Sequence, residues 1–160
     1  NGTAAPKRVL IIGPGSDFAP RTDLRDAPAT SYQPRLLREM FPAATIDCVD
    51  LNPRVVRAAA KDCDSSIQLD IGTSRLDRIY DTVIATNVLL YLDQPELLLA
   101  FQNIRAMLVK GGAFIHNDAR FETKVFGQAV DLPAVHFGSV TLDADRRPVL
   151  TDRWVIHRMR

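Results

Sequence analysis

The stretch VLIIGPG at residues 9–15 decides the fold predicted for this chain. Its first four residues are apolar and rich in β-branched side chains, which is typical of a strand buried on both faces of a parallel sheet. Gly13 and Gly15 then stop the strand, and a ligand can approach their backbone closely because neither carries a Cβ. A buried first strand followed by a glycine turn predicts an α/β fold with a binding site at the strand's end.

Four further apolar runs follow, and helical segments separate most of them. Strands are expected at 45–49, 66–69, 81–86 and 113–116. Helices are expected from Pro34 to Phe41, from the cap Asn52 to about Cys63, and from the cap Asp93 to the pair 111–112, which supplies a left-handed stop. The first helix carries an apolar stripe of Leu36, Leu37, Met40 and Phe41. The sequence therefore predicts a Rossmann-like three-layer α/β/α sandwich with a mostly parallel sheet.

Past residue 120 the pattern changes to two alternating runs, 135–142 and 153–157, around a polar turn near 143–147. Alternation on both sides of a turn predicts an antiparallel hairpin. We therefore expect the 160 residues to form a single domain, with a cofactor-binding core at 7–118 and a C-terminal closing hairpin at 119–160.

Polar residues stand at the ends of the predicted strands, where ligands bind in open α/β sheets. Asp50 follows the second strand and can accept both hydroxyls of a ribose, and a hydrogen bond to a charged acceptor contributes about 1.5–3 kcal/mol. Asp70 follows the third strand as an acid for a base amino group, and Ile71 beside it can pack on an adenine. Asn87 follows the fourth strand. Each acid alone is commonly a loop residue or a helix cap, but their order along the sheet predicts a cofactor site.

The motifs at 9–15, 49–53, 70–71, 80–89 and 108–114 resemble those of the class I S-adenosylmethionine-dependent methyltransferases, over about residues 7–118. The resemblance implies a Rossmann-like fold, S-adenosyl-L-methionine as cofactor, and methyl transfer to an acceptor that we expect to be a small molecule. It implies no metal. It assigns the cofactor contacts to Gly13, Gly15, Asp50, Leu51, Asp70, Ile71 and Asn87.

Three features depart from that family's pattern. Ile11 stands where the family carries an acid that holds the cofactor's amino group. Asp17 replaces the third glycine, and it either restores the missing carboxylate as a cofactor-binding residue or is an exposed turn aspartate. Gly13 and Asp50 are 37 residues apart, about twice the family's spacing, so an inserted segment enters beside the expected site, where Tyr32 and Gln33 can line a substrate pocket.

No catalytic residue is assigned, because methyl transfer from a sulfonium mainly requires alignment, and positioning alone can contribute about 7–11 kcal/mol. His116 and Asp118, at the end of the fifth strand, are the nearest candidates for a general base. A histidine in an apolar strand is more often a hydrogen-bonded core residue, so both interpretations of His116 stay open.

Composition excludes other classes of protein. Lys and Arg number 20 against 19 Asp and Glu, a formal net charge of +1, which argues against a nucleic-acid binder although five arginines lie between 146 and 160. No apolar stretch reaches the roughly 18 residues of a membrane span. Cys48 and Cys63 are 15 residues apart with no nearby histidine, so we expect buried thiols and a reducing, cytoplasmic setting. The oligomeric state is not predicted.

Two other functions compete with an active methyltransferase. One is a degenerate binding domain that kept the fold and lost catalysis. It is favoured by Ile11, by Asp17, by the short connection between the predicted strands 66–69 and 81–86, and by the few residues before Lys7. An NAD(P)-dependent oxidoreductase shares the sheet, but its fingerprint needs a glycine at position 18, where this chain has Phe18.

Overall fold

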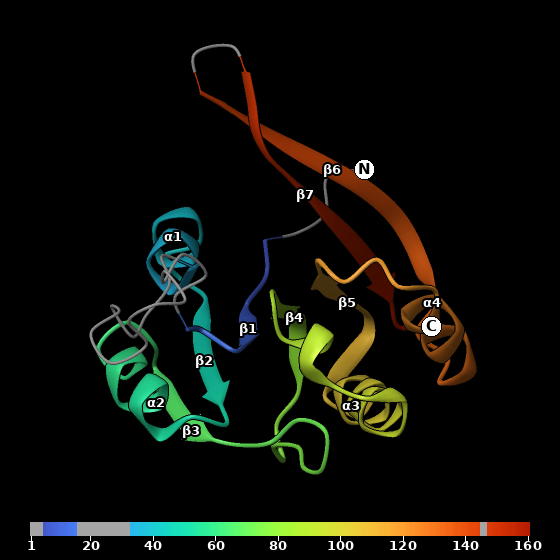
Figure 1. The fold of residues 1–160 in the computed structure, drawn as a ribbon. Helices are drawn as coiled ribbons and strands as arrows, with labels where there is room; N and C mark the ends of the chain where they lie inside the picture. The colour runs from blue at the N-terminus through green and yellow to red at the C-terminus, as the bar shows by residue number, and fades with distance from the viewer. Residues whose placement is uncertain (1–4, 16–32, 145–146) are drawn as a thin grey trace.

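The computed structural model describes residues 5–15, 33–144 and 147–160, and these form one mixed sheet flanked by helices (Figure 1). The strand order is β3-β2-β1-β4-β5-β7-β6; β1 to β5 are parallel, β7 is antiparallel to β5, and β6 is antiparallel to β7. The strands are β1 (Arg8–Ile12), β2 (Thr45–Asp50), β3 (Ser65–Gln68), β4 (Tyr80–Ala85), β5 (Leu108–His116), β6 (Ala134–Ala144) and β7 (Arg147–Arg158). The predicted α/β fold with its closing hairpin is confirmed.

Helices cover both faces of the sheet (Figure 1). They are α1 (Gln33–Met40), α2 (Pro53–Ala59), the short 3-10 helix η1 (Leu89–Tyr91), α3 (Gln94–Ala106) and α4 (Phe121–Ala129). Side chains alternate along β1, so Leu10 belongs to the core under α3 while Ile11 belongs to the core under α1 and α2. Within the described part of the chain, no helix has the length and apolarity needed to cross a membrane.

The predicted helix starts are confirmed by their caps. The Asn52 side chain accepts a hydrogen bond from the Arg54 amide at the start of α2. At the start of α3, the Glu96 amide donates to Asp93 at 2.9 Å and the Asp93 amide donates to Glu96 at 3.0 Å, which is the reciprocal pair of a capping box. The α2 helix ends at Ala59, earlier than the predicted Cys63.

The predicted role of the 111–112 glycine pair as a helix stop is wrong. Helix α3 ends at Ala106, and both glycines lie inside β5. Gly111 has φ +78°, and the pairing of β4 with β5 shifts from Tyr80–Leu108 to Thr82–Ala113 around it. The left-handed glycine therefore makes an irregularity in a strand, because a bulge needs the same backbone freedom as a helix end.

Two other helical predictions need correction. In α1, Leu36 and Met40 are 53% and 58% exposed, because this short helix touches the sheet with Pro34 and Leu37 instead of the whole predicted stripe. Helix α4, inside the segment predicted as hairpin alone, was not predicted. Its cap position, Arg120, makes no side-chain capping bond. The helix also contains Gly127, so the usual start signal is missing and a helix breaker is present.

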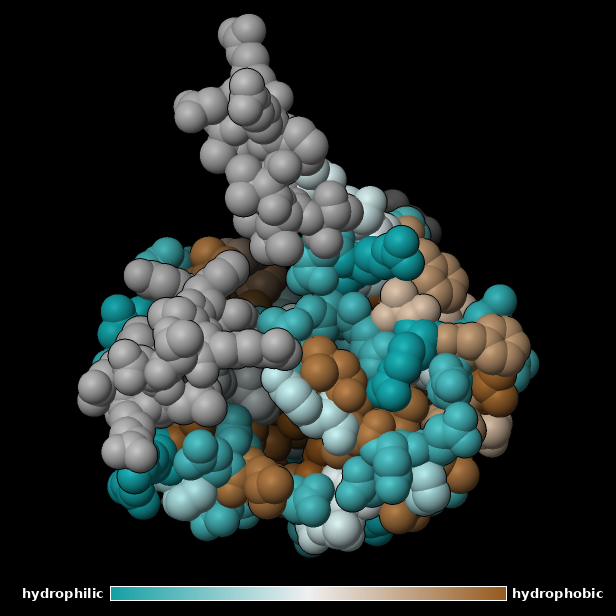
Figure 2. All heavy atoms as spheres, in the orientation of Figure 1, coloured by the Kyte–Doolittle hydropathy of each residue, from teal (hydrophilic) through white to brown (hydrophobic). Residues whose placement is uncertain are grey.

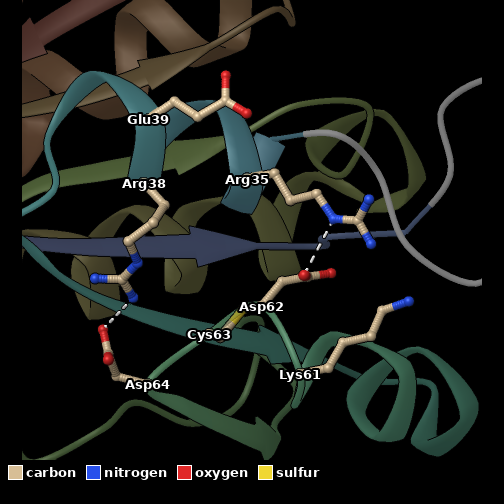
Figure 3. Close-up of a pocket in the computed structure, with 7 residues that line it drawn as sticks. All are labelled: Arg35, Arg38, Glu39, Lys61, Asp62, Cys63 and Asp64. Carbon is tan, nitrogen blue, oxygen red and sulfur yellow. Dashed lines mark hydrogen bonds and ion pairs between the residues drawn. The ribbon is translucent and has the colours of Figure 1, made fainter.

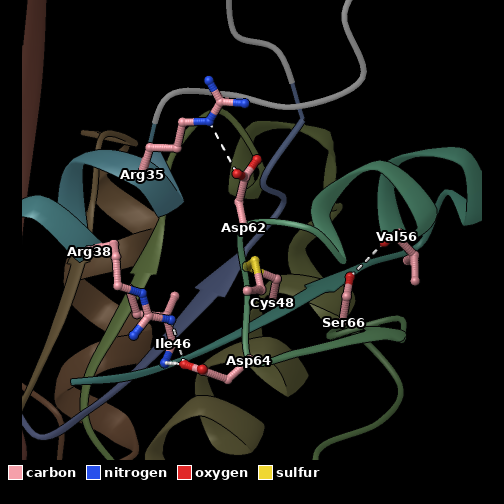
Figure 4. Close-up of a disulfide and its surroundings, with 9 residues drawn as sticks. Arg35, Arg38, Ile46, Cys48, Val56, Asp62, Asp64 and Ser66 are labelled. Atoms are coloured by element: carbon pink, nitrogen blue, oxygen red, sulfur yellow. Dashed lines mark hydrogen bonds and ion pairs between the residues drawn. A yellow bond between two sulfur atoms is a disulfide. The ribbon is translucent and has the colours of Figure 1, made fainter. Parts of the chain in front are cut away.

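The cysteines also differ from the prediction, because Cys48 and Cys63 form a disulfide (Figure 4). Cys48 lies in β2 and Cys63 in the turn between α2 and β3, with their Cα atoms 6.0 Å apart. The bond therefore ties the second strand to the entry of the third. The expectation of a reducing, cytoplasmic setting assumed two free thiols, and the disulfide removes that basis.

Candidate functional site

Five of the predicted cofactor residues lie around one cavity of about 190 Å³ at the carboxyl ends of β1, β2 and β3. Figure 2, in the orientation of Figure 1, shows apolar atoms around a hollow in the lower middle of the molecule. The predicted residues that line the cavity are Gly13, Asp50, Leu51, Asp70 and Ile71. The strand order reverses between β1 and β4 next to this cavity, which is where open α/β sheets bind ligands.

The Asp50 carboxylate lines the cavity, and only one of its two oxygens is hydrogen-bonded within the described part of the chain. One oxygen accepts a hydrogen bond from the Asn52 amide at 2.7 Å. The other oxygen has no hydrogen-bond partner among the described residues. Burial raises the pKa of Asp50 above its ordinary value, and the Asn52 hydrogen bond only partly offsets that effect. A partly buried acid with one oxygen free is suited to accept hydrogen bonds from a ligand.

Asp70 and Ile71 form the neighbouring wall of the cavity. The Gly72 amide donates to one Asp70 oxygen at 2.9 Å, and the backbone carbonyl of Asp70 accepts from two following amides, so the turn is rigid. Ile71 is 4% exposed, and its carbonyl accepts from the Asn103 side chain at 2.8 Å. The Leu69 amide donates to the Asp50 carbonyl at 3.0 Å, so the two acid-bearing turns sit side by side.

The described structure explains why residue 13 is glycine but not why residue 15 is. Gly13 has φ +71°, and a Cβ there would lie 2.2 Å from the Val88 side chain, so the fold itself requires glycine. At Gly15 a Cβ would meet only Val55, at 3.8 Å, among the described residues. Gly15 does not line the cavity, but it is the glycine whose absent Cβ the described structure leaves unexplained.

Asn87 lies just outside the cavity, next to Val88, which lines it. It has φ +55°, a left-handed conformation that asparagine tolerates better than most residues. The Asn87 amide donates to the Asn117 side chain at 2.8 Å, and the Asn117 amide group donates to the Asn87 side-chain oxygen at 2.7 Å. These two bonds fix the turn after β4 to the turn after β5.

Part of the inserted segment falls outside the described residues, and with it Asp17, Phe18 and Tyr32. Gln33 is described as the first residue of α1, and its side-chain nitrogen donates to the Thr86 hydroxyl at the end of β4. The insertion therefore rejoins the fold at the edge that carries the candidate site.

His116 is a core residue, as the second interpretation of it held. Its Nε2 lies 2.9 Å from Nε2 of His157, and Nδ1 of His157 lies 2.7 Å from the Leu132 carbonyl, so His157 donates from Nδ1 and His116 donates from Nε2. The Asp118 amide donates to Nδ1 of His116 at 3.2 Å, which occupies the last ring nitrogen. Burial lowers the pKa of His116 to about 3. This fully bonded pair is not a general base.

Asp118 is also occupied by internal partners. Its carboxylate lies 2.7 Å from Nη2 of Arg120 and also accepts from Nε of Arg120 at 2.9 and 3.1 Å. The Arg120 amide donates to the same carboxylate at 3.0 Å, and the guanidinium also donates to the Leu89 carbonyl. Asp118 therefore anchors η1 and the start of α4, and it is not available as a base.

Two other cavities carry no predicted site residue. One of about 430 Å³ lies between α1 and the turn before β3 (Figure 3), and four of its charged side chains form ion pairs: Arg35 with Asp62 at 3.1 Å and Arg38 with Asp64 at 2.6 Å. A larger one, of about 560 Å³, lies near Lys7 and the 111–112 glycines, at the opposite end of the parallel strands from Asp50. Among the described residues, no group of three or more acids, cysteines or histidines is arranged to hold a metal ion.

The cavity also contains residues that the sequence did not single out as site residues. These are Ile12, Leu69, Val88, Tyr91 and Leu92. Tyr91, at the end of η1, is 77% exposed. An aromatic residue four positions after Asn87, close to a predicted strand end, was the sequence signal that could have identified it. The apolar members gave no such signal, because core and pocket positions have the same residue types.

Comparison with known proteins supports the fold. No known family model matches the chain, and no curated protein sequence matches it. Among solved structures, the N-methyltransferase NodS from Bradyrhizobium japonicum is 17% identical with a TM-score of 0.66, over 97% of this chain and 86% of that one. A TehB-like S-adenosylmethionine-dependent methyltransferase from Corynebacterium glutamicum is 15% identical with a TM-score of 0.65, over 96% and 80%. The sugar N-methyltransferase KedS8 from a Streptoalloteichus species is 14% identical with a TM-score of 0.66, over 98% and 81%. This chain has the fold of the class I S-adenosylmethionine-dependent methyltransferases.

Proposed function

We propose that this protein is an S-adenosylmethionine-dependent methyltransferase that acts on a small molecule. The main observation in support is the cavity at the carboxyl ends of β1 to β3, where the partly hydrogen-bonded Asp50 carboxylate and the Asp70–Ile71 turn lie side by side. The names of the similar structures support it, since they are methyltransferases with the same fold.

The size and residues of the cavity fit the nucleoside half of the cofactor. Small-molecule sites usually measure roughly 300–1,000 Å³, so a cavity of about 190 Å³ takes only part of such a ligand. In this proposal Asp50 accepts hydrogen bonds from the ribose hydroxyls, and Asp70 accepts one from the adenine amino group beside the apolar Ile71. Leu51 lines the cavity and Gly15 lies at the turn beyond β1, toward which the rest of the cofactor would extend.

The reaction needs little covalent chemistry from the protein. S-adenosylmethionine supplies a methyl group that its sulfonium has already activated. With the base, the ribose and the amino-acid end of the cofactor facing β3, β2 and β1 in turn, the next strand along the sheet is β4, and Asn87 lies just after it. The side chains of this chain then bind the acceptor and align it, and alignment alone can account for about 7–11 kcal/mol of the barrier.

Calorimetric titration with S-adenosylmethionine, S-adenosylhomocysteine and NAD in parallel tests the proposal. Binding of the first two ligands and not of NAD is the expected result. Binding of NAD alone contradicts the proposal and supports the oxidoreductase. Absence of binding to all three ligands contradicts it as well and supports a degenerate domain that kept the sheet and lost the cofactor.

A further inference from the structure

A polar row runs along the carboxyl edge of the sheet from β4 to β7. It consists of Asn87 after β4, Asn117 after β5 and Asp152 in β7. Strand β7 pairs with β5 only from Val155 to Arg158, so Asp152 lies beyond the carboxyl end of β5. Figure 1 shows the hairpin that carries it projecting away from the body of the sheet.

The Asn117 side chain connects the other two members of the row. One of its amide hydrogens is donated to the Asn87 oxygen at 2.7 Å. The same nitrogen lies 3.4 and 3.5 Å from the two oxygens of Asp152, at the outer limit of hydrogen bonding. Asn117 therefore orients a carboxylate that it does not saturate.

The charge of Asp152 is not neutralised within the described part of the chain. No Lys, Arg or His there forms an ion pair with it. Its other contact among the described residues is with the neighbouring Arg153 amide, which donates to one oxygen at 2.8 Å. Asp152 is exposed, so a ligand can reach it. The neighbouring Asp118 differs, because Arg120 neutralises its charge.

We propose that Asn87, Asn117 and Asp152 form the acceptor subsite and that the acceptor is a primary or secondary amine bound by the Asp152 carboxylate. The inference rests on the proposed function, because that function directs the reacting methyl toward β4. A carboxylic acid acceptor would be repelled by Asp152. A carboxylate is too weak a base to deprotonate an alcohol, whereas it binds and orients an amine through charge-assisted hydrogen bonds.

The transfer step balances with these groups. The lone pair of the neutral amine forms the new C–N bond as the C–S bond breaks, and the electron pair of that bond stays on sulfur, which becomes a neutral thioether. Positive charge moves to the nitrogen, whose additional proton leaves to water. The negative charge of Asp152 stabilises the charge that develops on the nitrogen.

Binding of matched probes to the protein loaded with S-adenosylhomocysteine tests the inference. The probes are two series that differ only in the reacting group: benzylamine, benzyl alcohol and benzoate, and glucosamine, glucose and glucuronate. Calorimetry is expected to show tighter binding of at least one amine than of its alcohol and acid partners. In Asp152→Asn this preference should fall about 10- to 100-fold, and Asp152→Glu should restore part of it.

Asp131→Asn is the matched control, because it makes the same change at an exposed aspartate that is not part of the row. It should leave the preference unchanged, and all variants should bind S-adenosylhomocysteine like the parent. An absent amine preference, or one that Asp152→Asn retains, overturns the inference. Failure of the parent protein to bind S-adenosylhomocysteine instead overturns the proposed function, so the two failures are distinguishable.

Discussion

Asp50 and Asp118 occupy similar places in the sheet but have opposite surroundings. Asp50 is the last residue of β2 and Asp118 lies just beyond β5, so both are at the carboxyl edge of the parallel strands, and both are at least partly buried. Asp118 receives a guanidinium and a backbone amide, so its charge is compensated internally. Asp50 receives one amide, and its second oxygen has no partner in the described structure. The comparison shows that an acid at a strand end is a ligand-binding candidate only when the fold leaves part of it unsatisfied.

The largest effect is expected from breaking the satisfied side of this comparison with Arg120→Ala. This change leaves the Asp118 carboxylate, which is 5% exposed, without its cation. Removing one partner of a buried pair costs about 3–5 kcal/mol, and we expect about 3 kcal/mol because Arg120 itself is 37% exposed. Urea unfolding measures it. Arg75→Ala, at an exposed arginine, is the control, and equal midpoints for the two variants would contradict the assigned role.

The region around Asp50 is held by the disulfide, and removing it should have the next largest effect. The bond closes a loop between residues 15 apart, for which the loop-entropy relation gives about 3 kcal/mol. The double variant Cys48→Ala/Cys63→Ala should therefore unfold at a lower urea concentration than the oxidised parent. Adding a reductant should lower the parent's midpoint and leave that of the variant unchanged. A parent that does not respond to reductant would show that the bond does not contribute.

Acid should destabilise the β5–β7 region through the histidine pair. Burial lowers the pKa of both His116 and His157 in the folded protein, while unfolded histidines titrate near pH 6.5. Below that pH the unfolded state binds more protons, so stability falls as the pH decreases, by at most about 1.4 kcal/mol per pH unit for each histidine. Unfolding curves at pH 7.5, 6.5 and 5.5 measure the slope. A stability that stays constant down to pH 5.5 would refute the assignment of the buried His116–His157 pair as neutral in the folded protein.

Asp50→Asn should reduce ligand binding with little effect on folding. Loss of a charged acceptor should weaken S-adenosylmethionine binding about 10- to 100-fold. The free energy of unfolding should change little, since burial already raises the pKa of Asp50 and its charge does not stabilise the fold. For the same reason, affinity in the parent should fall as the pH decreases toward this raised pKa, and the variant should lose that dependence. Calorimetry measures both effects. Asp77→Asn, at an exposed aspartate, is the control, and equal affinities in the two variants would exclude Asp50 from the site.

Much of the fold was predictable because its signals are local. The apolar run of β1, the capping box at Asp93 and the alternation in β6 and β7 each depend on residues within a few positions of one another. Helix α4 was missed because its local signals point the other way. A Cβ at Gly127 would lie 2.6 Å from both the His157 ring and the Leu132 carbonyl, so this helix breaker is required by a contact with a distant strand.

The candidate site was predictable in part for the same reason. Strand ends can be located from the sequence, and parallel strands bring their carboxyl ends to one edge, so Asp50, Asp70 and Gly13 were expected to converge. The partners that decide the role of each acid lie in segments that only folding brings together. The place of Asp152 beside Asn117, 35 residues earlier in the chain, depends on how the hairpin joins β5.

The sequence by itself determined the parallel strands, the closing hairpin, the starts of α2 and α3 and the edge of the sheet that carries the candidate site, because periodicity and capping are local properties of the chain. Only the tertiary structure decided the state of each polar group. It joined Cys48 to Cys63, bonded His116 to His157 across 41 residues, neutralised Asp118 with Arg120, and left Asp50 half-satisfied. The physical reason is that a polar side chain is available to a ligand only where it lacks an internal hydrogen-bond partner. Packing between distant segments decides which internal partners it has.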